Sequence, residues 1–206
     1  MFKKGFTLAE VLITLGIVGV IAAITLPTLT QSTTTAQIGP KLAKAASAFE
    51  QANKALLDAY DVDRFSDTNL SSGGSAYVDA LSNHFNFSYD GTNIVSKDGI
   101  GYVVSMTYSK FDDQMPAHKQ RLGLVTVDIN GPKGNPNTSG TDIFNFSLWN
   151  DGSLRPMGGT NWFGGESPMA GSEYHWTVQC PNGATPADPD FCAGHVFENN
   201  LKVLYR

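Results

Sequence analysis

The segment from Phe6 to Leu26 is the feature that most limits what this chain can fold into. It is apolar apart from one carboxylate, Glu10, and a few threonines and glycines. As a helix, about 21 residues that rise ~1.5 Å each just span the hydrocarbon core of a bilayer. Lys3 and Lys4 precede the run and supply the positive charge that keeps such an end in the cytoplasm. We therefore expect a helix that crosses a membrane once and leaves the rest of the chain outside the cytoplasm.

Glu10 separates three interpretations of this segment. A carboxylate inside a membrane helix is costly to insert and needs a partner, and we expect none for Glu10 within its own helix. An ordinary secretory signal would place its small-residue cleavage site after the apolar run, whereas Gly5 precedes it. An ordinary signal anchor explains the lysines and the span but leaves Glu10 without a purpose.

The third interpretation rests on residues 3–15, which read Lys-Lys-Gly-Phe-Thr-Leu-Ala-Glu-Val-Leu-Ile-Thr-Leu. This stretch closely resembles the processing site of type IV prepilins and type II secretion pseudopilins. The resemblance implies that a prepilin peptidase cuts between Gly5 and Phe6 and methylates the new amino terminus. It implies that the Glu10 carboxylate pairs with the Phe6 amine of a neighbouring subunit during assembly. Pro27 falls where that family commonly has a helix-kinking proline.

The same resemblance implies a function, partners and a location. The chain is expected to be a structural assembly subunit of a type IV pilus or type II secretion filament, and not an enzyme. Its partners would be other pilin or pseudopilin subunits, the prepilin peptidase and methyltransferase, the inner-membrane assembly platform and membrane lipid. It would begin as a single-pass protein of the bacterial inner membrane and end in a periplasmic or cell-surface filament. The alternative is a filament-displayed or membrane-anchored module that binds calcium, a glycan or an adhesion target.

Composition and motifs agree with a binding or structural role. Loss of Lys3 and Lys4 with the leader takes the formal charge from −5 to −7. Non-specific affinity for nucleic acid comes mostly from contacts between basic side chains and phosphates. Because this chain is net acidic, we expect no nucleic-acid partner. No Gly-x-Ser-x-Gly, His-Glu-x-x-His or phosphate-binding glycine loop is present in the sequence.

The chain divides into a leader at residues 1–5, a membrane and assembly helix at 6–29, an amphipathic stem helix at 30–60 and a globular β domain at 61–206. The stem helix is predicted from apolar residues that recur every three or four positions: Ile38, Leu42, Ala45, Ala46, Phe49, Ala52, Leu56 and Tyr60. The Gly39-Pro40 pair disfavours continuous helix, so we expect a kink or a locally melted turn there. A simple boundary between two helices is the alternative.

We predict an α+β, pilin-like fold, with the long N-terminal helix packed on an antiparallel sheet and a loop-rich C-terminal region. Strands are predicted at 100–109, 122–129 and 143–150, with a hairpin turn at Asp151-Gly152. Tyr77, Leu81 and Phe85 at spacing four predict a short helix before the sheet.

The segment from Asp128 to Asp142 is rich in glycine, asparagine and proline. Asp128, Asn130 and Asp142 offer oxygen ligands that suit a hard cation such as calcium, although their spacing does not match a helix-loop-helix calcium site. Some major pseudopilins hold calcium in a loop of similar composition. The alternative is that these side chains only form turns through hydrogen bonds to the backbone.

Cys180 and Cys192 are the only two cysteines. In an oxidising compartment outside the cytoplasm we expect them to form a disulfide, and many pilins close their C-terminal region in this way. A zinc site is the alternative and would need His175 and His195. Trp149, Trp162 and Trp176 fit either the core or an exposed binding platform.

Overall fold

The computed structural model describes residues 7–106, 120–159 and 174–205, and within its first helix the side chains of residues 22–35 are outside the description. Contacts divide the chain into an N-terminal segment, residues 1–37, and a head, residues 38–206.

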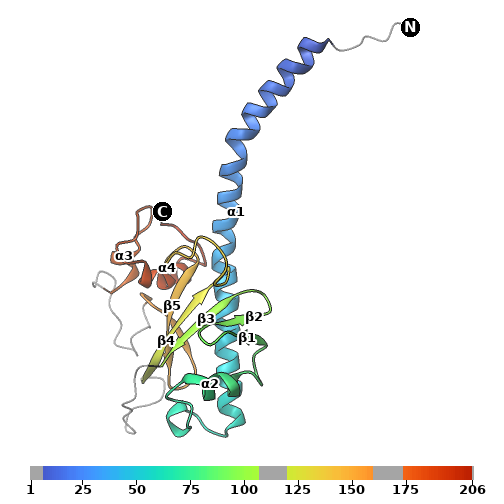
Figure 1. Ribbon diagram of the computed structural model, residues 1–206. Helices are drawn as coiled ribbons and strands as arrows, with labels where there is room; N and C mark the ends of the chain where they lie inside the picture. The colour runs from blue at the N-terminus through green and yellow to red at the C-terminus, as the bar shows by residue number, and fades with distance from the viewer. Residues whose placement is uncertain (1–6, 107–119, 160–173, 206) are drawn as a thin grey trace. The chain divides into compact units, whose positions relative to one another are not determined.

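The first helix, α1, spans Leu8–Ala59 as 52 continuous helical residues (Figure 1). The locally melted turn expected at Gly39-Pro40 is therefore wrong. Ile38 and Leu42 are buried on either side of this pair, and their burial stabilises the helix where Pro40 lacks an N–H. Close packing requires a glycine at position 39, because a Cβ there would lie 1.8 Å from the Leu201 carbonyl oxygen.

Within its described residues, the head contains one six-stranded antiparallel sheet whose strands follow chain order, β1 to β6 (Figure 1). The strands are β1 Phe87–Tyr89, β2 Ile94–Ser96, β3 Gly101–Ser105, β4 Arg121–Asp128, β5 Ile143–Trp149 and β6 Leu154–Pro156. The strands β3, β4 and β5 confirm the three predicted strands, although Ile100, Met106, Ile129 and Asn150 lie just outside them. Residues 107–109 of the first prediction lie outside the described residues. The turn at Asp151-Gly152 joins β5 to β6, and the Asp151 carboxylate accepts hydrogen bonds from the Ser153 N–H and hydroxyl.

The described part of the head also contains several short helices. They are the 3-10 helix η1 Phe65–Asp67, α2 Gly74–Leu81, α3 Trp176–Gln179, the 3-10 helix η3 Pro189–Phe191 and α4 Cys192–Glu198. The predicted short helix is α2, which buries Tyr77 and Leu81 in the core. Phe85, the third residue of that pattern, lies beyond the end of α2 and is partly buried.

The stem, which is the part of α1 within the head, packs on the sheet through its predicted apolar stripe. The Phe49 ring stacks on Tyr102 of β3 with centroids 4.8 Å apart, and the Tyr102 hydroxyl donates to the Ala45 carbonyl at 3.2 Å. Tyr60 is the exception, being 45% exposed just after the end of α1, so its assignment to the stripe is wrong. The α+β class is confirmed.

Candidate functional site

The N-terminal end of α1 forms a capping box between Thr7 and Glu10. The Thr7 N–H and hydroxyl both donate to Glu10 Oε2 at 2.8 Å, and the Glu10 N–H donates to Thr7 Oγ1 at 3.3 Å. Such reciprocal bonds satisfy N–H groups that would otherwise have no helical partner. The expectation that Glu10 has no partner within its own helix is therefore wrong. Its carboxylate is directed back towards the start of the helix.

Beyond this cap, the large apolar side chains from Leu8 to Ile21 are exposed. They do not form one stripe, because they occupy every side of the helix: Leu8, Val11, Leu12, Ile13, Leu15, Ile17, Val18, Val20 and Ile21. The polar Thr14 satisfies its hydroxyl by donating to the Glu10 and Val11 carbonyls of the same helix. An apolar surface of this extent is typical of a segment that other molecules cover. Within the described residues, none of the helices meets the combined requirement of length and apolar character for a membrane span.

The predicted processing residues, Gly5 and Phe6, lie outside the described residues. Pro27 lies within α1, in the part whose side chains are outside the description.

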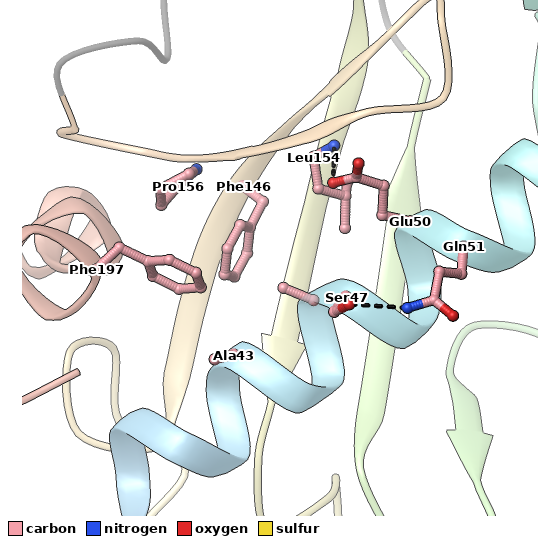
Figure 2. A pocket seen from close by; sticks show the side chains of 9 residues that line it. Ala43, Ser47, Glu50, Gln51, Phe146, Leu154, Pro156 and Phe197 are labelled. Atoms are coloured by element: carbon pink, nitrogen blue, oxygen red, sulfur yellow. Dashed lines mark hydrogen bonds between the residues drawn. The ribbon is translucent and has the colours of Figure 1, made fainter. Parts of the chain in front are cut away.

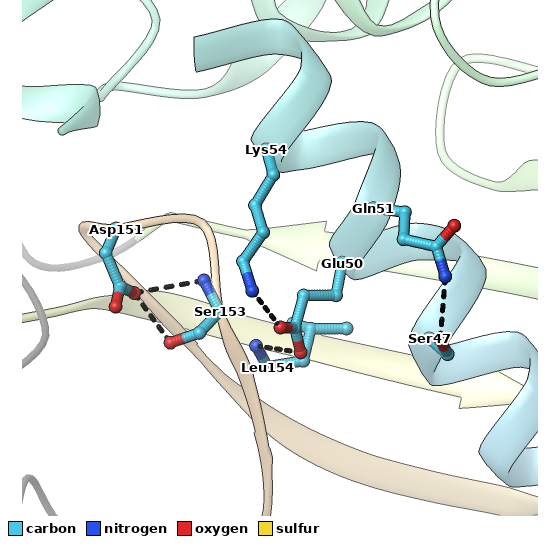
Figure 3. A network of polar contacts seen from close by, with 7 residues as sticks. All are labelled: Ser47, Glu50, Gln51, Lys54, Asp151, Ser153 and Leu154. Atoms are coloured by element: carbon cyan, nitrogen blue, oxygen red, sulfur yellow. Dashed lines mark hydrogen bonds and ion pairs between the residues drawn. The ribbon is translucent and has the colours of Figure 1, made fainter. Parts of the chain in front are cut away.

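A groove of about 330 Å³ lies between the stem and the edge of the sheet formed by β5 and β6 (Figure 2). Small residues of the stem line one side of the groove, and Phe146 of β5 and Leu154 of β6 line the other. Phe197 of α4 contacts Phe146 edge to face, with ring centroids 5.7 Å apart. Glu50 is its charged residue, and its carboxylate accepts from the Leu154 N–H at 3.2 Å and pairs with Lys54 (Figure 3). The Glu50 carboxylate thus fastens the β5–β6 hairpin to the stem, which is a structural role.

The segment from Asp128 to Asp142 is folded by its own acidic side chains. Asp128 Oδ1 accepts from the Asn130 and Gly131 N–H groups at 3.2 and 2.9 Å. The two carboxylate oxygens of Asp142 accept from Thr138 N–H at 2.6 Å and Asn137 N–H at 2.7 Å. Burial raises the pKa of Asp128, and the charge of Asp142 adds to the rise, against the two hydrogen bonds. These contacts agree with the turn interpretation, and they hold both carboxylates in one loop.

Asn130, the third proposed ligand, donates from its side-chain amide to the Asn135 carbonyl at 3.0 Å. Among the described residues, no group of three or more His, Cys, Asp or Glu side chains is arranged to hold a metal ion. The proposed calcium set contains only two such residues, so it remains a proposal that rests on the loop's composition.

Cys180 and Cys192 form a disulfide, with their Cα atoms 5.5 Å apart. Neither proposed histidine partner joins a metal group with them. His175 caps the N-terminus of α3 by accepting from the Thr177 N–H at 3.2 Å. His195 is fully buried and connects the disulfide region to the C-terminal tail.

The contacts of His195 fix its tautomer. The Leu204 N–H donates to Nε2 at 3.1 Å, so the proton lies on Nδ1, which donates to the Cys180 carbonyl at 2.7 Å. Burial lowers the pKa of His195, against the bond to Cys180, so the neutral ring is favoured. No local sequence pattern predicts this role, because it depends on a tail that packs back on a helix.

The tryptophans divide between core and surface. Trp149 is 3% exposed and belongs to the interior. Trp176 is half-buried and donates from Nε1 to the Glu198 carboxylate at 2.7 Å. Trp162 lies outside the described residues. Of the two described tryptophans, one is in the core and the other is held at its edge.

Comparison with known families identifies the N-terminal segment. Residues 1–26 match the family described as the prokaryotic N-terminal methylation motif, which is the prepilin signal of type IV pilins and pseudopilins. The chain therefore carries a prepilin signal, and its match includes Gly5, Phe6 and Glu10. That signal belongs to proteins that serve as structural subunits. Searches of curated proteins and of solved structures gave no match.

Proposed function

We propose that this protein is a pilin or pseudopilin, a subunit that is processed after Gly5 and assembled through its N-terminal helix into a filament. The observation that carries the proposal is the prepilin signal at residues 1–26. The exposed apolar side chains from Leu8 to Ile21 support it, because they suit lipid before assembly and neighbouring helices afterwards.

In this proposal the subunit starts in the bacterial inner membrane, with residues 6–29 crossing the bilayer and the head outside the cytoplasm. The prepilin peptidase removes residues 1–5 and methylates Phe6, and an assembly platform in the same membrane adds the subunit to a type IV pilus or type II secretion filament. Pro27 would bend the helix where it leaves the membrane.

The capping box refines the role of Glu10. Before assembly, Thr7 satisfies one carboxylate oxygen of Glu10 and lowers the cost of carrying that group in an apolar helix. During assembly the carboxylate would gain the Phe6 amine of a neighbour, forming a charge-assisted contact in an environment of low dielectric constant. A neighbour displaced along the filament could not form this contact, so the pair would set the register.

The intact mass of the protein purified from its own membranes tests the processing step. We expect a chain that begins at Phe6 with one added methyl group. Gly5→Ala should be processed better than Gly5→Val, because the peptidase must accommodate a small residue at that position. A chain that still begins at Met1, or one that is cut after residue 27, would contradict the proposal.

A further inference from the structure

We propose that Asn69 is an acceptor site for an N-linked oligosaccharide. The inference rests on the proposed function, because such a transfer takes place outside the cytoplasm, where that function puts the head. The acceptor would be the side-chain amide of Asn69, within the sequence Asp67-Thr68-Asn69-Leu70-Ser71.

Asn69 is one of four asparagines that are followed two residues later by serine, with no proline between them: Asn69, Asn86, Asn137 and Asn145. This tripeptide is the minimal acceptor signal for N-glycosylation. A carboxylate two residues before the asparagine would add a charge-assisted contact with a transferase that binds this loop. Only Asn69 has one, Asp67, since the other three have His84, Asn135 and Ile143 at that position.

The surroundings of Asn69 fit an acceptor. Asn69 and Asp67 are exposed, whereas Phe65 and Leu70 are buried and fix the loop to the head. The side chain of Asn69 makes no hydrogen bond among the contacts of the described residues, so its amide nitrogen is free to attack the donor sugar. The segment lies between η1 and α2, outside the sheet, where a bulky glycan displaces no packed side chain.

The competing asparagines are less suited. Asn145 lies in β5 and accepts from the Thr126 hydroxyl at 2.7 Å. Asn137 has a positive φ of 50° in the turn that its N–H forms with Asp142. Asn86 is exposed but immediately precedes β1, and its Ser88 is paired with Val95 in the sheet. Asn86 is therefore the closest matched comparison for Asn69.

The reaction needs a polyprenyl-pyrophosphate-linked oligosaccharide and a membrane transferase, both supplied by the cell. The Asn69 amide nitrogen attacks the anomeric carbon of the first sugar, and a carbon–nitrogen bond forms. The bond from that carbon to the pyrophosphate oxygen breaks, and the lipid pyrophosphate leaves with the electron pair. The amide loses one proton to solvent, and nothing is oxidised or reduced.

Mass spectrometry of the full-length protein from its own host tests the site. Trypsin should release residues 65–97 as one peptide, because no lysine or arginine lies between Arg64 and Lys97. That peptide contains both Asn69 and Asn86, and electron-transfer fragmentation assigns the added sugar to one of them. We expect the sugar on Asn69 alone.

Four variants complete the test. Asn69→Gln, Ser71→Ala and Asp67→Asn should each lose the added mass, and Asn86→Gln should keep it. Sugar on Asn86 with Asn69 unmodified, or full occupancy in Asp67→Asn, would overturn the inference. A chain that begins at methylated Phe6 without sugar would overturn this inference while leaving the proposed function intact. A chain that begins at Met1 would instead overturn the proposed function.

Discussion

Two stretches of α1 carry similar apolar side chains in opposite surroundings. From Leu8 to Ile21 the large apolar residues are between 44% and 81% exposed, whereas from Ile38 to Leu57 the buried apolar residues are at most 7% exposed. The second stretch confines them to one stripe, with Lys41, Lys44 and Lys54 exposed outside it. One sheet is enough to cover a stripe, but a helix that is apolar on every side needs surroundings that its own chain does not supply. The apolar residues from Ile38 to Leu57 therefore stabilise the head, whereas those from Leu8 to Ile21 need another molecule to cover them.

The largest effect should come from truncating the stem stripe. Phe49→Ala removes a fully buried ring that stacks on Tyr102 and should lower the free energy of unfolding of the head by about 3–5 kcal/mol. Ile13→Ala is the matched control, since Ile13 is 61% exposed, and should change it by less than about 0.5 kcal/mol. Chemical denaturation of the full chain in detergent, followed by tryptophan fluorescence, measures both. Equal effects from the two variants would remove the distinction between the stretches.

The C-terminal part of the head should depend on its disulfide nearly as strongly. Replacing both Cys180 and Cys192 by serine should lower the free energy of unfolding by about 3 kcal/mol, since it frees a loop of this size in the unfolded chain. The tail beyond α4 should become sensitive to protease first, because His195 joins it to the Cys180 carbonyl. Ala184→Ser, an exposed change in the same loop, should leave both properties unaltered. Two free thiols in the exported protein would contradict this prediction.

In the N-terminal segment a substitution should act on assembly and not on the head. Glu10→Val should leave the unfolding of the head unchanged but reduce filament yield, because it would remove the proposed charge-assisted contact between subunits, worth about 2 kcal/mol. Thr7→Val is the control, since it removes the hydroxyl of the capping box but keeps the carboxylate. If Glu10 acts only as a cap, the two variants should have equal yields. Electron microscopy of sheared filaments and subunit quantification would distinguish them.

The features that could be predicted from the sequence are those with a regular period. The stem stripe repeats every three or four residues, and the strands β3, β4 and β5 are five to eight residues long, so each carries its pattern within its own segment. The strands β1, β2 and β6 have three residues each, which is too few for alternation to be distinguished. The prepilin signal could be read because its residues occupy fixed positions.

The features that the sequence does not predict depend on contacts between distant residues. Asn53 is buried in the stem because the Tyr77 hydroxyl donates to its amide oxygen at 2.5 Å, 24 residues further along. The sequence predicts that Gly39 interrupts the helix, whereas in the structure this glycine allows the close approach of Leu201. The partner of Glu10 does have a local signal, because Thr7-Leu8-Ala9-Glu10 has the spacing of a capping box.

The smallest expected effect is the change in melting temperature when calcium is removed from the protein. If calcium binds the loop from Asp128 to Asp142, chelation should lower the melting temperature of the full protein by about 2–4 °C, because losing a ligand of the folded state costs about 1 kcal/mol. Bound calcium would offset the repulsion by which Asp142 raises the pKa of Asp128. Asp128→Asn and Asp142→Asn should each abolish the shift, measured by calorimetry with and without chelator.

Asp90→Asn is the matched control for that experiment. Asp90 also folds a turn by accepting from backbone N–H groups, those of Thr92 and Asn93, but it lies in a different loop. This variant should keep the full response to chelator. Identical melting of the unaltered protein with and without chelator would leave only the turn interpretation of Asp128 and Asp142. The head would then need no bound calcium for its stability, whereas the exposed apolar residues of the N-terminal segment would still require a partner.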